Sequence, residues 1–186
     1  MEVSVLVQVR LLTRRHKRRK EQAVRRLLTF AATVVLAGIA LVPAATAEKP
    51  IRMLAPTAEP FVLEGPCAFD VRLEVLTNKE VGTAFSDGRF LVTGSYKVRL
   101  TNLDPGGGSI DVNISGPGDF TPTEDGGFTL NARGNWLFWF FPGDLGITSG
   151  RLLLTSGHTT EVLDAAFTPV SFTPSRNVTD ACALLA

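Results

Sequence analysis

Residues 48–186 of this chain hold few of the groups on which catalytic, metal-binding and nucleic-acid-binding sites depend. They contain one histidine, His158, and two cysteines, and their Lys and Arg form no cluster. Without a basic cluster to neutralise phosphates, we expect no nucleic-acid binding. The Cys and His spacing matches no metal site, and no nucleophile-elbow pattern occurs. We therefore expect no metal, no other cofactor and no catalytic residue, and the sequence favours a binding domain over an enzyme.

The positive charge of the chain is concentrated at its beginning. The net charge of the whole chain is +1, but residues 1–47 hold nine of the nineteen Lys and Arg, which leaves −6 on residues 48–186. A basic stretch, Arg14 to Arg26, precedes the uncharged apolar run Leu27 to Val42 and the small residues Ala45-Thr46-Ala47. This order is typical of a cleavable signal peptide.

We therefore predict a signal peptide over residues 1–47, with cleavage after Ala47. An uncleaved membrane anchor is the alternative, although the apolar run is shorter than the roughly 20 residues that span a bilayer. Arginine pairs such as Arg14-Arg15 leave the twin-arginine route open beside the general one. The mature protein is then secreted or associated with the cell envelope, and it meets the membrane only during export.

Two cysteines, Cys67 and Cys182, stand near the two ends of the mature chain, 115 positions apart. In an oxidising compartment outside the cell, a disulfide between them is the favoured interpretation. Two independent thiols are the alternative. A bridge over so long a loop would tie the ends of the domain together and restrict its unfolded state.

Short β-like segments separated by Gly, Pro and Asp-Gly turns fill most of the mature chain, and no long amphipathic stretch predicts a helix. We predict an all-β fold, an antiparallel β-sandwich with a small β-barrel as the alternative. A flexible tether over residues 48–60 would lead into a single β-domain over 61–186, which we expect to be a monomer. A helical turn or two is expected only near Asp180 to Leu185. The predicted strands are Phe69–Val75, Arg89–Thr93, Ser95–Leu103, Ser109–Ser115, Gly127–Ala132, Asn135–Phe141, Arg151–Thr155 and Glu161–Val170.

The segment from Asn135 to Phe141 is the most unusual part of the sequence. As a strand it places Trp136, Phe138 and Phe140 on one face and apolar residues, including Trp139, on the other. A central strand buried on both faces is the first interpretation. In the second, one aromatic face lines a cavity or platform for a ligand.

Two hypotheses for function follow. The first is a non-enzymatic extracellular domain that recognises a cell-envelope polymer, an apolar small molecule or a protein partner. The second is a small-barrel enzyme or ligand carrier whose cavity is lined by this aromatic strand. The candidate ligand-binding residues are Trp136, Phe138, Trp139, Phe140, Arg133, Asp144 and His158.

Several motifs occur together in an order that resembles a known group of proteins. They are Gly65-Pro66-Cys67-Ala68-Phe69, Thr77-Asn78-Lys79-Glu80, Ser115-Gly116-Pro117-Gly118, Arg133 to Phe138, Phe141-Pro142-Gly143-Asp144 and Asp180-Ala181-Cys182. The chain resembles a widespread group of small secreted proteins of actinobacteria. The resemblance implies export, a bacterial source and a paired Cys67 and Cys182. The group has no established activity, so no functional residue is carried over.

Overall fold

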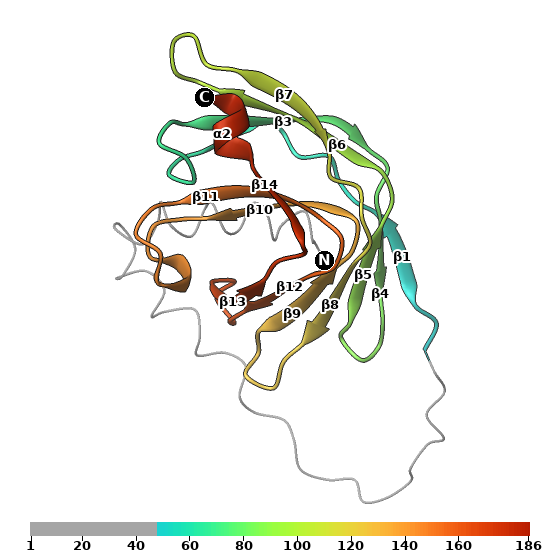
Figure 1. Cartoon of the computed structure of the whole chain (residues 1–186). Helices are drawn as coiled ribbons and strands as arrows, with labels where there is room; N and C mark the ends of the chain where they lie inside the picture. Colours follow the sequence, from blue (N-terminus) through green and yellow to red (C-terminus); the bar gives the residue numbers. More distant parts are fainter. Residues whose placement is uncertain (1–47) are drawn as a thin grey trace, which may run out of the picture.

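Three antiparallel β-sheets make up the protein in a computed structural model that describes residues 48–186 (Figure 1). The predicted signal peptide, residues 1–47, lies outside the described residues. Within the described part each sheet has two edge strands, so none closes on itself. The fold is the predicted β-sandwich and not a closed barrel.

The three sheets are defined by their strand order. The largest consists of β1 (Ile51–Leu54), β4 (Val81–Ala84), β5 (Phe90–Thr93), β8 (Gly118–Pro122), β9 (Phe128–Ala132), β12 (Thr159–Leu163) and β13 (Pro169–Thr173). The second consists of β2 (Phe61–Leu63), β3 (Val71–Asn78), β6 (Tyr96–Asn102) and β7 (Ser109–Asn113). The smallest consists of β10 (Asn135–Phe140), β11 (Arg151–Ser156) and β14 (Asn177–Asp180).

The smallest sheet lies between the two larger ones, so that β10 is covered on both faces (Figure 1). Leu137 and Trp139 belong to a core shared with the four-stranded sheet. Phe138 and Phe140 belong to a second core shared with the seven-stranded sheet. The continuous apolar sequence of β10 therefore comes from burial on both faces, as our first interpretation assumed, but β10 is an edge strand of its sheet and not the central strand that was expected.

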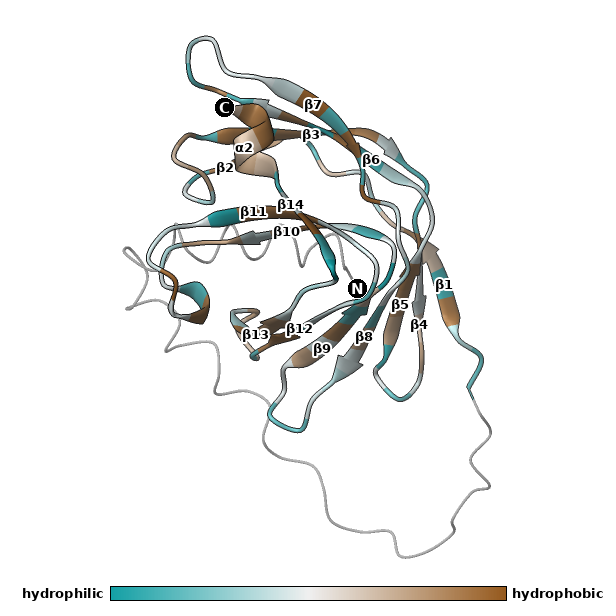
Figure 2. Ribbon diagram, in the orientation of Figure 1, coloured by the Kyte–Doolittle hydropathy of each residue, from teal (hydrophilic) through white to brown (hydrophobic). Residues whose placement is uncertain are grey.

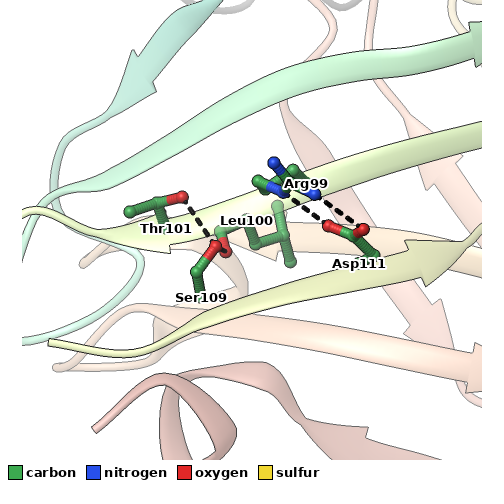
Figure 3. Close-up of polar contacts among 5 residues, drawn as sticks. All are labelled: Arg99, Leu100, Thr101, Ser109 and Asp111. Carbon is green, nitrogen blue, oxygen red and sulfur yellow. Dashed lines mark hydrogen bonds and ion pairs between the residues drawn. The ribbon is translucent and has the colours of Figure 1, made fainter.

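The four-stranded sheet shows the alternation expected of a strand with one solvated face. In β6, Val98 and Leu100 are fully buried, whereas Arg99 points outward. Across the β6–β7 pair, Arg99 donates two hydrogen bonds to Asp111, at 2.6 and 2.8 Å, and the hydroxyls of Thr101 and Ser109 lie 3.0 Å apart (Figure 3). These exposed cross-strand pairs favour the observed register of the hairpin.

Seven of the eight predicted strands match one observed strand each, and the eighth is divided. The predicted strand from Glu161 to Val170 consists of β12 and β13 with a turn between them. The carboxylate of Asp164 accepts backbone hydrogen bonds from Ala166 and Thr168, both at 2.8 Å. This local side-chain bonding competes with the sheet ladder and makes the turn.

Five strands were not predicted, namely β1, β2, β4, β8 and β14. Strand β1 lies in the segment for which the sequence predicted a flexible tether, and it pairs with β4 from Ile51 to Leu54. Strand β8 begins with Gly118. A Cβ atom there would collide with the indole ring of Trp136, so glycine serves packing and not chain reversal.

The chain ends are joined by a disulfide between Cys67 and Cys182, as predicted, with 5.5 Å between the Cα atoms. Cys182 lies in α2 (Ala181–Leu185), where helix was expected, and the Asp180 carboxylate caps this helix by accepting from the Cys182 amide at 2.8 Å. Figure 2 colours α2 as hydrophobic, and Ala181 and Leu185 are fully buried against the four-stranded sheet. Residues 48–186 contain no helix with the length and hydropathy to span a bilayer.

Replacing both cysteines with serine is expected to lower the free energy of unfolding by about 4 to 5 kcal/mol, because the bridge closes a 115-residue loop. Urea unfolding of the variant and of the oxidised protein measures the difference. Equal free energies of unfolding would contradict the expectation and would show that the sheets alone hold the two ends together.

Candidate functional site

A cavity of about 260 Å³ lies between the sheets and is lined almost entirely by apolar side chains. Its lining comes from all three sheets and from the segment after β1. The residues are Met53, Leu54, Ala55, Pro56, Ala58, Phe61, Leu73, Glu80, Gly82, Phe90, Val92, Tyr96, Ile114, Phe120, Leu130, Trp136, Leu137, Phe138, Trp139, Glu161, Leu163 and Phe167. A concave, apolar site with a few polar groups is the usual form of a small-molecule site.

The cavity borders the free edge of β10. Among the described residues this strand pairs only with β11, and four consecutive β10 residues, Trp136 to Trp139, line the cavity although they alternate between its two faces. Gly157 donates its amide hydrogen to Gly134, whereas the Asn135 amide donates to Ser115. The Asn135 amide thus points away from β11. In an antiparallel pair, every second residue of a strand points its backbone N–H and C=O groups to the same side. The backbone groups of Leu137 and Trp139 therefore also point away from β11, toward the cavity.

The lining of the cavity includes a carboxyl group and a phenol, from Glu80 and Tyr96. Glu80 lies in the turn between β3 and β4. Tyr96 is the first residue of β6 and pairs with Asn78, the last residue of β3, which precedes Glu80 by two positions. Burial raises the pKa of Glu80 to about 7. Burial also raises the pKa of Tyr96 to about 12, with a smaller contribution from the negative charge of Glu80. Both shifts indicate partial exclusion of water, and the contribution of Glu80 to the pKa of Tyr96 indicates that the two groups are neighbours.

These two side chains lack partners within the described part of the chain. No hydrogen bond or ion pair of residues 48–186 involves the Glu80 carboxyl or the Tyr96 hydroxyl. Glu80 is half-buried, and a partly desolvated carboxyl without a partner is costly and a frequent mark of a functional site. Their hydrogen-bonding capacity is therefore open to a molecule in the cavity.

The segment that follows β1 forms one wall of the cavity. Ala55 donates its amide hydrogen to the Glu80 carbonyl at 3.0 Å, and the Asn78 side chain donates to the carbonyls of Ala55 and Pro56 at 3.3 and 3.2 Å. These bonds hold the segment against the turn that carries Glu80. The Ala58 side chain lines the cavity, whereas its neighbour Thr57 is exposed.

Of the candidate ligand-binding residues, the structure brings Trp136, Phe138 and Trp139 to the cavity. Phe140 does not line it, because its ring packs edge-on against Phe172 in the second core, with 4.8 Å between ring centroids. The indole nitrogen of Trp139 is buried and has no hydrogen-bond partner among residues 48–186.

The three polar candidates lie elsewhere. The Arg133 side chain is exposed, and its carbonyl accepts a hydrogen bond from the Trp136 indole at 3.2 Å. His158 is exposed in the turn between β11 and β12. Asp144 is buried, but its carboxylate accepts from the Phe141 amide at 2.8 Å in the turn after β10. Its position is that of a structural turn residue.

The polar residues of the cavity, Glu80, Tyr96 and Glu161, were not predicted from the sequence. Glu80 follows Asn78-Lys79, which is typical of a solvated turn, and only the fold buries its side chain. Glu161 is 3% exposed on β12, between two other inward-facing residues, Thr159 and Leu163. Tyr96 is the only tyrosine of the chain, and this was the one signal in the sequence that could have singled it out.

The described residues include no group of three or more His, Cys, Asp and Glu side chains that could hold a metal ion. No protein-family model matches the chain, and neither does any curated protein or solved structure.

Replacing Glu80 with Gln is expected to stabilise the protein at about pH 8 and to change little at about pH 4. The pKa of Glu80 is about 7 in the folded protein, above the ordinary value of 4.5, so the folded state favours the protonated carboxyl. The contribution of this proton to the free energy of unfolding is fully present below about pH 4.5. It is lost as the pH rises through 7. Urea unfolding at several pH values should show a gap between the two proteins that widens across this window.

The matched control is Glu59→Gln, which removes the same charge from an exposed position. Its effect on the free energy of unfolding should not grow between pH 4 and 8. If the Glu80→Gln gap stayed constant as well, Glu80 would titrate as an ordinary solvated carboxyl.

Proposed function

We propose that this protein binds a small apolar molecule in the cavity between its sheets and acts as a carrier or receptor for it. The cavity itself is the observation that carries the proposal. Its volume of about 260 Å³ lies near the lower end of ligand sites, which run from roughly 300 to 1,000 Å³. The ligand would therefore be compact.

The composition of the lining supports binding more than catalysis. Among the described lining residues there is no Ser, Thr, Cys, Lys or His, so none of these can act as a nucleophile or base. Glu80, with its pKa of about 7, and the second lining carboxyl, Glu161, are the groups suited to general acid–base work. An enzyme that moves a single proton on an apolar substrate is thus the second candidate, and turnover of a bound molecule would be required to support it.

Recognition of a polymer or a protein partner has less support. Three of the four aromatic side chains of β10 lie inside the molecule and not on a flat outer face, and Phe138, Trp139 and Phe140 are 4%, 8% and 1% exposed. Aromatic platforms for extended ligands need rings accessible from outside. A small molecule that enters the cavity meets the same rings without such a surface.

We propose that the protein acts outside the cytoplasm. The bridge between Cys67 and Cys182 is compatible with an oxidising compartment. The basic and apolar leader over residues 1–47 and the resemblance to secreted actinobacterial proteins support export. We propose a protein that is secreted or held at the cell envelope, where a carrier would protect an apolar molecule from water.

We expect the purified protein to bind 1-adamantanol, a compact and neutral apolar alcohol, with a dissociation constant below about 1 mM. Both tryptophans of the chain line the cavity, so intrinsic fluorescence should change in the same concentration range as the heat of binding. Isothermal titration calorimetry and the emission spectrum provide two independent readouts.

The variant Ala58→Phe places a ring at the cavity wall and should weaken binding at least about tenfold by filling the space that the ligand needs. Thr57→Phe is the matched control, since it adds the same ring at the neighbouring exposed position. Failure of the parent protein to bind the alcohol by either readout, or equal affinities for both variants, would contradict the proposed function.

A further inference from the structure

The charges around the cavity indicate which apolar molecules it would accept. None of the described lining residues is Lys, Arg or His, whereas two of them, Glu80 and Glu161, carry carboxyl groups. A ligand with a carboxylate or phosphate would enter an apolar site of like charge with no cation to pair with it. Fatty acids and similar anions are therefore disfavoured as ligands.

From this lining we propose that the ligand is a compact hydrophobic amine, with its ammonium group at Glu80 and Tyr96 and its apolar body against the aromatic wall of β10. The inference rests on the proposed function, since it names the chemical class of the molecule in the same cavity. An amine supplies what the described lining lacks, a cation that donates hydrogen bonds.

Glu80 is the residue that distinguishes an amine from a neutral ligand. Its carboxyl lines the cavity, and no ion pair or hydrogen bond within residues 48–186 satisfies it. A desolvated carboxylate gains more from a charged donor than from a neutral one, because charge-assisted hydrogen bonds are about twice as strong. The Tyr96 oxygen can accept a second hydrogen bond from the same ammonium group.

Aromatic rings in the lining add a further preference for a cation. Phe61, Phe90, Tyr96 and Trp136 line the same cavity as Glu80. Faces of such rings attract ammonium groups, and the attraction is larger where water is excluded. The charge of −6 on residues 48–186 would also draw cations toward the protein from solution.

A matched set of three probes tests this inference: 1-adamantylamine, 1-adamantanol and adamantane-1-carboxylate share one skeleton and differ in the polar group. At about pH 8 we expect the amine to bind roughly tenfold to a hundredfold more tightly than the alcohol, the margin typical of a hydrogen bond to a charged group. The carboxylate should bind most weakly. Calorimetry on the purified protein measures all three.

The variant Glu80→Gln should abolish the preference by bringing the amine to within about twofold of the alcohol, because a neutral amide forms no charge-assisted hydrogen bond with the ammonium group. Glu59→Gln removes an equal charge from an exposed site outside the cavity lining and should keep the preference. A preference that survives Glu80→Gln would overturn the assignment of the ammonium to Glu80.

Titration of the unaltered protein gives a test that needs no variant. Lowering the pH from about 8 to 5.5 protonates Glu80, whose pKa is about 7, and should remove most of the amine preference. Tyr96, with a pKa of about 12, keeps its proton throughout, and Glu161 is the remaining titratable group in the described lining. A preference independent of pH would count against Glu80.

The outcomes separate this inference from the proposed function. If the alcohol binds but the amine is not preferred at pH 8, the amine inference is wrong and the carrier function stands. If none of the three probes binds, the proposed function fails, and the inference fails with it.

Discussion

Burial of one aromatic strand on both faces is the constraint on which this architecture depends. Strand β10 belongs to two cores, with Trp139 packed toward the four-stranded sheet and Phe138 and Phe140 toward the seven-stranded sheet. Removing so much apolar surface from water requires a layer on each side. The two large sheets provide these layers, and the short sheet of β10, β11 and β14 fills the space between them (Figure 1).

The cavity follows from the same arrangement. A strand between two layers is well covered on its faces, but the free edge of β10 has no neighbouring strand within the described residues. Side chains from both larger sheets reach toward this edge without filling the space, and about 260 Å³ stays open. The site thus lies where the sandwich cannot complete its packing. Such a void is lined with aromatic rings because β10 supplies them.

Polar groups in this cavity have properties that the same residues would lack in solution. Glu80 comes from a turn, yet the segment after β1 and the rings of the cavity exclude water from its carboxyl and raise its pKa to about 7. The disulfide between Cys67 and Cys182 acts at another level, by joining the start and the end of the domain beside α2. The raised pKa of Glu80 defines the chemistry of the site, whereas the disulfide restricts the conformations of the unfolded chain.

The sequence by itself determined the all-β class, the disulfide, the C-terminal helical turn and seven of the strands, because alternation, turn residues and the cysteine pair are local or compositional signals. It also indicated that β10 is buried on both faces. Only the tertiary structure decided which residues meet at the cavity. Glu80, Tyr96 and Glu161 come from different strands and turns, and their common surroundings depend on how three sheets pack. Arg133 and His158 were chosen for their chemistry but lie exposed, since chain proximity to an aromatic strand does not set the direction of a side chain. Gly118 begins a strand that the sequence did not predict, and it is a glycine because the indole ring of Trp136, distant in the sequence, occupies the space of a side chain.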